Sequence, residues 1–411
     1  MKTKIAIIGA GPAGLSLANA LLRQGEGDFL VLEREAEAGG LCRSAIVDGS
    51  PLDIGGGHFL DVRRPAVTEF LFGFMPENEW DKYERDSRIS IHGQMIGSPF
   101  EANIWQLDGE HQERYLRDIA EAGCNRSEPC PRQFVDWIYW KLGKGIAEDY
   151  MLPYNRKMFG DDLNLLGTYW LEKLPNVSYE DTLRSCREHR PYAVQPGHAI
   201  FYYPKKYGYG EVWRRMGEAL GDRLLLGCPV RTLDAATRAI NSDIKADIIV
   251  NTSPWTAFEK VDGLTEASLS GIASLKHTSI EVDYAPENLD TKAQWIYLPD
   301  PSLPEHRWLV RHNFCPGSRG YWKETRVGRN VPKAGEDAFR FTSDYAYPLN
   351  TIGKNETVAA LLGELAPMRI YGLGRWGEWQ HYNSDVVVAR SLEMANRLRK
   401  PEVAGCATKG V

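Results

Sequence analysis

Three glycines and one acid near the start of the chain have the types and spacing of a dinucleotide site. The glycines follow an apolar run, and the acid ends a second apolar run; they are Gly9, Gly11, Gly14 and Glu33. Gly9 permits a tight turn, Gly11 lets the backbone approach a pyrophosphate, and Gly14 allows close packing of a helix on a strand. The helix N-terminus offers N–H groups to the phosphates, and Glu33 can accept hydrogen bonds from ribose hydroxyls.

Two further glycine-rich segments follow within the next few tens of residues. The first contains Gly40 and Arg43, and the second contains Gly56, Gly57 and His58. A simple NAD site needs neither segment, so they indicate a longer ligand, and both look like the FAD domain of the amine oxidase and protoporphyrinogen oxidase class. An ordinary glycine turn is the alternative for the second segment, and there His58 would only cap the turn. A second G-x-G-x-x-G motif after a strand is missing from the sequence, so we expect no separate NAD(P)H domain.

The elements that must position these residues follow from periodicity and from glycine and proline punctuation. Residues 4–60 predict a β-α-β unit, residues 88–96 a hairpin, and residues 263–350 a β-rich region. Helices are predicted over 110–121, 132–142, 146–152, 211–220 and 386–398, with strands over 224–226 and 247–251. The fold class is therefore α/β, a Rossmann-type FAD-binding domain with a helical insertion and an antiparallel β-sheet substrate domain.

We expect the FAD-binding domain to be discontinuous. Its parts are residues 1–65, 205–262 and 350–400; the helical domain is 108–195, the β substrate domain is 66–107 with 263–349, and 401–411 is a loose tail.

The segment 374–385 opens the last predicted helix and carries the most specific motif. It begins Gly374-Arg375-Trp376-Gly377 and resembles the Gly-Arg-x-Gly-x-aromatic signature, with a following Asp, of UDP-galactopyranose mutases. A helix N-terminus placed at the flavin would stabilise a reduced, negatively charged flavin, and Arg375 would add a full charge.

The resemblance extends over about residues 4–398 and implies roles for further positions. It implies cofactor contacts by His58, Arg88, Val230, Gly374, Arg375, Asn383 and Ser384. It implies a substrate pocket made by Phe100, Glu101, Asn155, Phe159, Lys173, Tyr203, Arg307, Tyr347 and His381. Within these sets, His58, Arg307, Tyr347, Arg375 and His381 would be catalytic, with Arg307 and Tyr347 holding the substrate diphosphate.

The activity that the resemblance implies is interconversion of the pyranose and furanose forms of a nucleoside-diphosphate hexose. In the mutases, N5 of reduced FAD is the nucleophile at the anomeric carbon, and NAD(P)H or dithionite supplies the reduction. The cofactor then carries the covalent chemistry and the protein supplies orientation and charge. An FAD-dependent oxidoreductase of the amine oxidase or desaturase class is the main alternative, and a non-catalytic flavin protein is a third.

Three positions depart from the mutase pattern. Lys173 stands where the family usually has arginine, so the charge is kept without the bidentate fork. His381 stands in place of a tyrosine, and Glu101 in place of the glutamine near uracil in eukaryotic mutases. A carboxylate accepts from amino and imino N–H groups, so we expect CDP- or GDP-linked sugars to compete with UDP-sugars. The alternative is a Glu101 side chain that faces solvent.

Composition limits the partners. The net charge of −6 without a basic block argues against nucleic acid, and the apolar runs are too short for a membrane span. The chain runs directly into its first strand, so we expect no signal peptide. Its seven cysteines are scattered, so we expect reduced thiols, a cytoplasmic protein and no metal site. A homodimer is left open.

Overall fold

The computed structural model describes residues 1–171, 177–192, 199–329 and 339–399. They form two compact units, each built from separate stretches of chain. The first unit contains residues 1–40, 213–265 and, of the described chain, 362–399; the second contains 41–212 and 266–361. Helices α7 (Gly210–Glu218) and α9 (Lys354–Leu365) run across the boundaries. The division into three domains drawn from the sequence stays a prediction.

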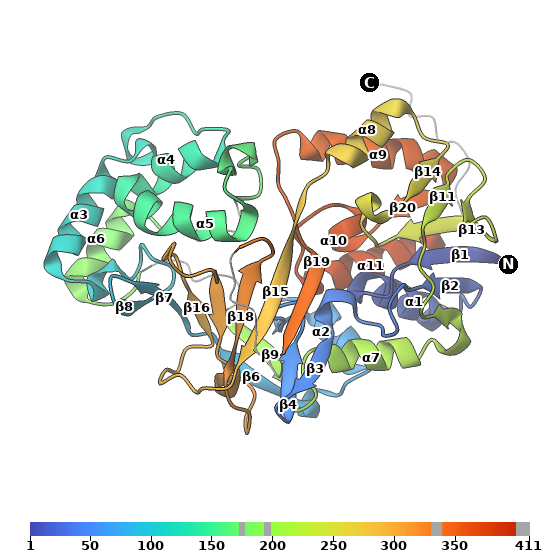
Figure 1. Ribbon diagram of the computed structural model, residues 1–411, viewed down its shortest axis with the longest axis horizontal. Helices are drawn as coiled ribbons and strands as arrows, with labels where there is room; N and C mark the ends of the chain where they lie inside the picture. Colours follow the sequence, from blue (N-terminus) through green and yellow to red (C-terminus); the bar gives the residue numbers. More distant parts are fainter. Residues whose placement is uncertain (172–176, 193–198, 330–338, 400–411) are drawn as a thin grey trace. The chain divides into compact units, whose positions relative to one another are not determined.

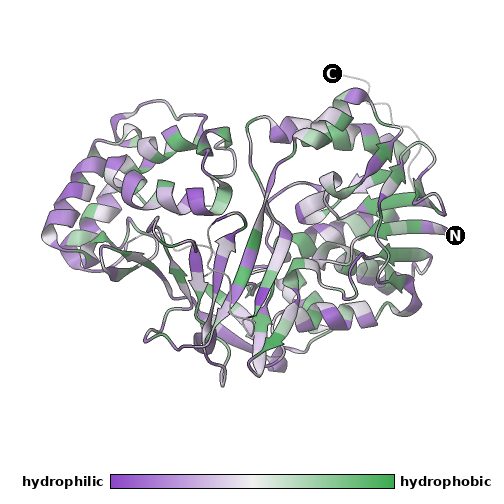
Figure 2. Ribbon diagram, in the orientation of Figure 1, coloured by the Kyte–Doolittle hydropathy of each residue, from purple (hydrophilic) through white to green (hydrophobic). Residues whose placement is uncertain are grey.

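The first unit is built on a mostly parallel sheet (Figure 1). Its strand order is β10-β2-β1-β13-β12-β11-β14, and β20 also pairs with β13. The strands are β1 (Lys2–Ile8), β2 (Phe29–Leu32), β10 (Leu224–Leu225), β11 (Thr232–Asp234), β12 (Ala239–Ile240), β13 (Ile244–Asn251), β14 (Lys260–Asp262) and β20 (Ile370–Gly372). Runs such as Phe29-Leu30-Val31-Leu32 are apolar throughout, as expected of parallel strands covered on both faces. Figure 2 shows these central strands as largely hydrophobic.

Helices α1 (Pro12–Arg23), α10 (Gly374–Gly377) and α11 (Ser384–Arg399) belong to the same unit. Helix α1 packs against α11, and the Ser391 hydroxyl donates to the Ala13 carbonyl at 3.1 Å. The last helix of the sequence is therefore joined to the first.

The second unit contains a seven-stranded sheet in the order β19-β15-β18-β17-β16-β7-β8. All neighbouring pairs are antiparallel except β16 and β7. The strands are β7 (Ser87–Ile91), β8 (Gln94–Gly97), β15 (His277–Ala285), β16 (Trp295–Tyr297), β17 (Arg307–Leu309), β18 (Tyr321–Arg326) and β19 (Arg340–Pro348). The predicted hairpin is β7–β8, whose turn holds His92 and Gly93 at positive φ.

Helices and two small sheets complete the second unit. The helices are α2 (Pro65–Phe72), α3 (Gly109–Ala120), α4 (Phe134–Ile146), α5 (Leu152–Phe159), α6 (Tyr179–Glu188) and α8 (Glu266–Ser274). The hairpin β3 (Ser44–Val47) and β4 (Ser50–Asp53) forms one small sheet, and β5 (Leu60–Asp61), β9 (Ile200–Pro204) and β6 (Trp80–Glu84) form the other. Helices α3, α4 and α5 share a buried core with the β7–β8 hairpin.

The predicted fold class, an α/β Rossmann-type domain with helices and an antiparallel sheet, is confirmed. Two local predictions were wrong. Helix α8 lies inside the region predicted to be β-rich, because its nine residues bury only Ser268 and Ile272 and give little periodic signal. The helix predicted over 146–152 does not end there, because α5 follows directly and Pro153 lies in its first turn, where proline is tolerated.

Candidate functional site

The glycine turn of the first unit has room for a ligand at one position. Gly9 adopts φ +98°, and a Cβ added to Gly14 would lie 1.9 Å from the Gly9 carbonyl oxygen, so the fold itself requires these two glycines. A Cβ added to Gly11 would meet only the Gly40 Cα, at 3.9 Å. Packing within the protein therefore does not explain Gly11, whereas close approach of a pyrophosphate would.

Glu33 is buried beside this turn and already orders two backbone amides. Its Oε2 accepts from the Ala10 N–H at 2.7 Å and its Oε1 accepts from the Glu35 N–H at 3.0 Å. Each carboxylate oxygen has a second lone pair, so Glu33 keeps acceptor capacity for ribose hydroxyls. The first unit thus fits the nucleotide half of a dinucleotide.

The segment before α11 is held by two buried or half-buried charges. The Arg375 guanidinium donates from Nε and Nη2 to the Tyr382 carbonyl, at 3.1 and 2.8 Å. Glu378 accepts from the Gly374 N–H and pairs with Arg390. Asn383 is exposed and Ser384 begins α11, while His381 is half-buried. Arg375 therefore fixes the loop that carries His381.

In the second unit, Asp53 joins the segment that carries Arg43 and Ser44 to Tyr203 and Tyr209. Its carboxylate accepts from the Ser44 hydroxyl at 2.5 Å, the Tyr203 hydroxyl at 3.1 Å and the Tyr209 N–H at 3.2 Å. The His58 ring stacks over the Tyr209 ring at 6.1 Å. Burial raises the pKa of Asp53 to about 7, against the lowering effect of these hydrogen bonds. Tyr203 is itself buried, and its hydroxyl is used in the hydrogen bond to Asp53.

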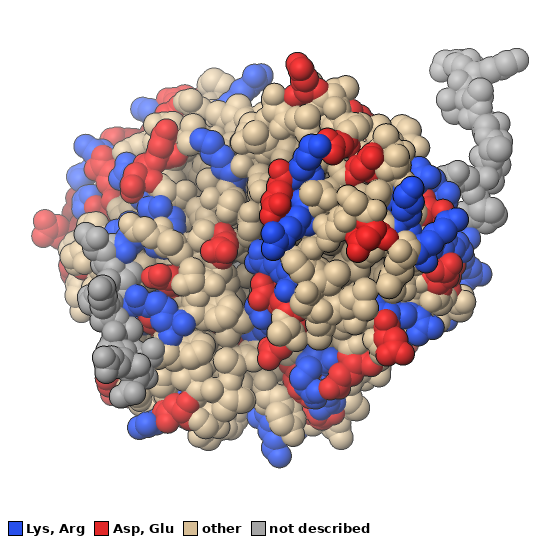
Figure 3. Space-filling view, turned by 45° about the vertical axis from the view of Figure 1, so that its right-hand side comes forward, with Lys and Arg blue, Asp and Glu red and all other residues tan. Residues whose placement is uncertain are grey.

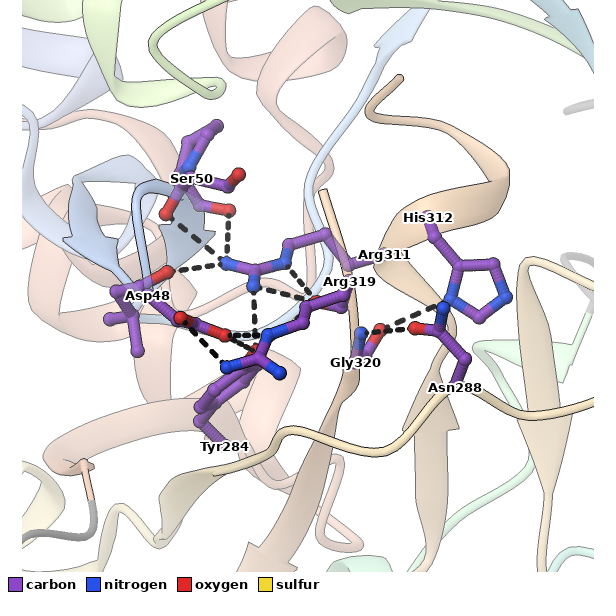
Figure 4. A network of polar contacts seen from close by, with 10 residues as sticks. Asp48, Ser50, Tyr284, Asn288, Arg311, His312, Arg319 and Gly320 are labelled. Carbon is purple, nitrogen blue, oxygen red and sulfur yellow. Dashed lines mark hydrogen bonds and ion pairs between the residues drawn. The ribbon is translucent and has the colours of Figure 1, made fainter. Parts of the chain in front are cut away.

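The hairpin β3–β4, which carries Ser44 and Asp53, is fastened by a fully buried arginine (Figure 4). Arg311 donates from Nη1 to the carbonyls of Val47 at 2.9 Å and Ser50 at 3.1 Å. Its Nη2 donates to the Tyr284 hydroxyl at 3.0 Å and to the Arg319 carbonyl at 2.6 Å. One side chain thus ties the hairpin to the large sheet.

Arg307 lies on β17 of that sheet and is paired with a buried acid. Its Nε donates to Glu324 Oε2 at 3.0 Å, and its Nη2 contacts the same oxygen. Its side chain is 17% exposed, and that of Glu324 is 0% exposed. His306 Nε2 lies 3.4 Å from Glu324 Oε2, and burial lowers the pKa of this histidine.

Tyrosines gather around Arg307, and most of them were missed from the sequence. Tyr154, Tyr297 and Tyr347 all lie close enough to couple electrostatically to the guanidinium. Tyr154 packs edge-on to Tyr297, with ring centroids 5.6 Å apart. Burial raises the pKa of Tyr297, but Arg85 and Arg307 outweigh burial and leave this pKa below its ordinary value. Of these, the sequence had singled out Arg307 and Tyr347.

Arg85 was also missed, since the sequence argument chose its neighbour Arg88. Arg88 pairs with Asp86, at 2.6 Å between Nε and Oδ1. Arg85 instead stacks on the Trp295 ring at 4.5 Å and donates to the Tyr297 hydroxyl at 2.9 Å. Arg85 lies before β7 and Arg88 lies within it, so the alternation of the hairpin predicted over 88–96 gave no information about Arg85.

The remaining predicted positions are dispersed. Phe100 is 1% exposed and packs on Tyr115 and Tyr150 in the helical core. Asn155 is buried and donates to the Met151 carbonyl, and Phe159 packs edge-on to Trp170. Glu101 is half-buried, and burial raises the pKa of its carboxyl. Arg43 lies 5.7 Å from the Phe341 ring centroid, and Val230 lies in a loop of the first unit. Lys173 lies outside the described residues.

Acidic and basic side chains are interspersed over the face of the molecule in Figure 3. Within the described ranges, none of the helices is both long and apolar enough to cross a membrane.

Comparison with known sequences matches only part of the chain. A family model described as an NAD(P)-binding Rossmann-like domain matches residues 7–72. The chain is 27% identical over 130 residues to a Baeyer-Villiger monooxygenase of Pseudomonas aeruginosa, which is 29% of this chain and 24% of that protein. It is 50% identical over 52 residues to an uncharacterized protein in the nifH2 3' region of Methanothermococcus thermolithotrophicus, which is 13% of this chain and 49% of that one. The matches thus span about a quarter and about half of these relatives' lengths.

Comparison with solved structures covers nearly the whole chain. A reduced UDP-galactopyranose mutase matches with a TM-score of 0.86 at 23% identity, over 97% of this chain and 94% of that one. Cyclohexylamine oxidase from Brevibacterium oxydans matches with a TM-score of 0.62 at 14% identity, over 97% and 100% of the two chains. A CLA-producing fatty acid isomerase from P. acnes matches at 0.63 and 16%, over 97% and 99%. The expected likeness to the mutases is confirmed as a likeness of fold, and all three neighbours are enzymes by name.

Proposed function

We propose that this protein is a flavin-dependent mutase that interconverts pyranose and furanose forms of a nucleoside-diphosphate hexose. The fold likeness to a UDP-galactopyranose mutase supports this proposal, since it extends over 97% of the chain. The observation that carries it is the group around Arg307, in which a guanidinium and several phenols converge.

The Arg307 group has the chemistry of a diphosphate site. Guanidinium and phenol donors make charge-assisted hydrogen bonds to phosphate oxygens, and such bonds are the strong ones. Two guanidiniums, of Arg85 and Arg307, face Tyr297, and Glu324 compensates one of them. The excess positive charge suits an anionic leaving group, with Tyr347 as a further ligand in this proposal.

FAD is the cofactor in this proposal. The open position at Gly11 and the remaining acceptor capacity of Glu33 fit its nucleotide half. Reduced flavin, when bound, supplies the nucleophile for covalent catalysis at the sugar. The residues of this chain bind and orient: Arg307 and the tyrosines would hold the diphosphate, and Asp53 would keep His58 and its loop in place through Tyr209. NAD(P)H or dithionite is the proposed reductant.

The second candidate is an oxidoreductase of the amine oxidase class, favoured by the fold likeness to cyclohexylamine oxidase. The charge around Arg307 argues against it. An amine substrate is a cation at neutral pH, and two guanidiniums with one carboxylate would repel it. The mutase is therefore the better supported of the two.

A single experiment separates the candidates. Dithionite-reduced protein is incubated with UDP-, CDP-, GDP- and dTDP-hexoses, and pyranose and furanose forms are separated. A mutase gives the other ring form without stoichiometric oxidation of NAD(P)H. The same protein gives no isomer when its flavin is oxidised or is replaced by 5-deazaFAD. Peroxide production from amines without any isomerisation would overturn the proposal in favour of the oxidase.

A further inference from the structure

Lys157 is a buried lysine outside the set of residues that the proposed function uses. It lies on α5 and is 1% exposed. Its ammonium donates to the carbonyls of Leu298 at 2.7 Å and Glu305 at 2.9 Å. Leu298 directly follows β16 and Glu305 comes shortly before β17. Because a buried charge must keep its hydrogen-bond partners, this one side chain holds the connected ends of the two strands together.

The strand ends that Lys157 holds lie beside the proposed anion site. In the register of β16 and β17, Tyr297 stands directly opposite Arg307. Residues that stand opposite each other in an antiparallel pair share one face of the sheet. The Leu298 N–H continues the pairing by donating to the His306 carbonyl at 3.0 Å. Lys157 therefore closes the β16–β17 hairpin immediately beyond the pair of Tyr297 and Arg307.

Helix α5 also presents an aromatic ring to that pair. Tyr154 lies one helical turn before Lys157, so the two side chains are neighbours on the helix surface. The Tyr154 ring packs edge-on to the rings of Tyr297 and His306, with centroids 5.6 and 6.1 Å apart. The helix thus meets the hairpin at two points, with Tyr154 at the site and Lys157 at the hairpin end. Loss of the ammonium would free both the hairpin end and the helix turn that carries Tyr154.

We propose that Lys157 is a positioning residue for the anion site: its ammonium fastens the end of the β16–β17 hairpin to α5, and so keeps Arg307, Tyr297 and Tyr154 in the arrangement that binds a diphosphate. This inference rests on the proposed function. A charged ammonium makes stronger hydrogen bonds to carbonyls than a neutral amine does, so the fastening depends on the proton of Lys157.

The charge of Lys157 changes within a pH range that is easy to reach. Burial lowers the pKa of Lys157 to about 8, and Arg329 lowers it further, whereas Asp300 and Glu305 act in the opposite direction. The side chain is therefore mostly charged at neutral pH and mostly neutral one unit above its pKa. If the charged form is the one that fastens the hairpin, anion affinity falls as the pH rises through this pKa.

The other titratable groups at the site allow this effect to be isolated. Burial lowers the pKa of His306, so this side chain is neutral throughout the range, whereas Arg307 and Glu324 stay charged because their pKa values are shifted away from it. Burial raises the pKa of Tyr154, which stays neutral. Tyr297, whose pKa is lowered, is the group to control, because a phenolate beside Arg307 would also weaken anion binding.

The test measures the dissociation constant of UDP from the holoprotein by calorimetry, at about pH 7 and at about pH 9. In the wild type it should rise about tenfold, since about one-tenth of Lys157 keeps its proton at the higher pH. Lys157→Met should bind UDP about tenfold more weakly than the wild type at the lower pH, without a further rise. Tyr297→Phe has no phenol to ionise and should keep the wild-type rise.

Lys323→Met is the matched control. Lys323 lies on β18 of the same sheet, and its ammonium lies 4.0 Å from the Glu305 carboxylate. The variant therefore removes a positive charge from the same neighbourhood without touching the bond of Lys157 to the Glu305 carbonyl. It should keep both the wild-type affinity for UDP and its rise with pH.

The outcomes distinguish this inference from the proposed function. The inference is overturned by a wild-type dissociation constant that is equal at the two pH values, or by a Lys157→Met protein that is less stable but binds UDP as the wild type does. A rise that disappears in Tyr297→Phe, or an equal loss of affinity in Lys323→Met, overturns it as well. The wild-type titration decides even if Lys157→Met does not fold. A flavin-loaded wild type that fails to bind UDP at neutral pH refutes the proposed function instead.

Discussion

Arg307 combines a partly exposed side chain with a buried counter-charge, and this combination sets what its removal should do. In Arg307→Ala, each lost charge-assisted bond to phosphate costs about 1.5–3 kcal/mol of binding free energy. We expect UDP affinity, measured by calorimetry, to fall about 100-fold, at constant flavin content. Glu324 would be left buried without its cation, so the free energy of unfolding should fall by about 3–5 kcal/mol. Wild-type affinity for UDP would refute the role of Arg307.

Glu101 is the residue at which the choice of base should depend on pH. Burial raises the pKa of its carboxyl, so protonation begins at a higher pH than in an exposed glutamate. The carboxylate only accepts hydrogen bonds, whereas the protonated acid also donates one. We therefore expect CDP to compete best with UDP at neutral pH and to lose ground as the pH falls. Glu101→Gln should favour UDP at every pH. If UDP binds the wild type at least about tenfold tighter than CDP at neutral pH, the inference from Glu101 is wrong.

At the scale of elements, the hairpin β3–β4 depends on one buried guanidinium. In Arg311→Met, several carbonyls that now accept from Arg311 would stay buried without donors. We expect the free energy of unfolding, measured in urea, to fall by about 3 kcal/mol or more, since each such group costs about 1–3 kcal/mol. Arg319→Met is the matched control, because the pair of Arg319 with Asp48 is exposed and worth at most about 1 kcal/mol. Equal losses in the two variants would contradict this account.

Asp53, which joins that hairpin to the loops at His58 and Tyr209, should give stability a distinct pH dependence. Its pKa is raised to about 7 in the folded protein from an ordinary value of 3.8. The folded state therefore holds the proton more tightly, and the contribution of Asp53 to stability falls as pH rises from about 4 to about 7. Asp53→Asn cannot ionise, so the stability of the wild type relative to the variant should decrease across this window. If the free energies of unfolding of the wild type and of Asp53→Asn differed by the same amount at every pH, this account would be ruled out.

At the scale of the whole molecule, the purified protein should be yellow, with about one bound FAD. Gly11→Val places a branched side chain where only a ligand would meet it, since a Cβ there lies 3.9 Å from the nearest protein atom. We expect that variant to fold but to be colourless. Gly363→Ala on α9, where an added Cβ meets nothing within 4 Å, should keep its colour. Full flavin occupancy in Gly11→Val, measured by absorbance, would sink the assignment of the glycine turn.

The amino-acid sequence by itself determined the β-α-β unit with its glycine turn and with Glu33 after its second strand, because those residues lie close together along the chain. It also singled out Arg307 and Tyr347, through motifs that resemble a family. Only the tertiary structure decided their partners: Gly57 and Glu324 are 267 residues apart, and Arg85 and Tyr297 are 212 apart. A buried charge is compensated by whatever the fold brings within hydrogen-bonding distance, and strand pairing across a sheet sets that distance irrespective of separation in sequence.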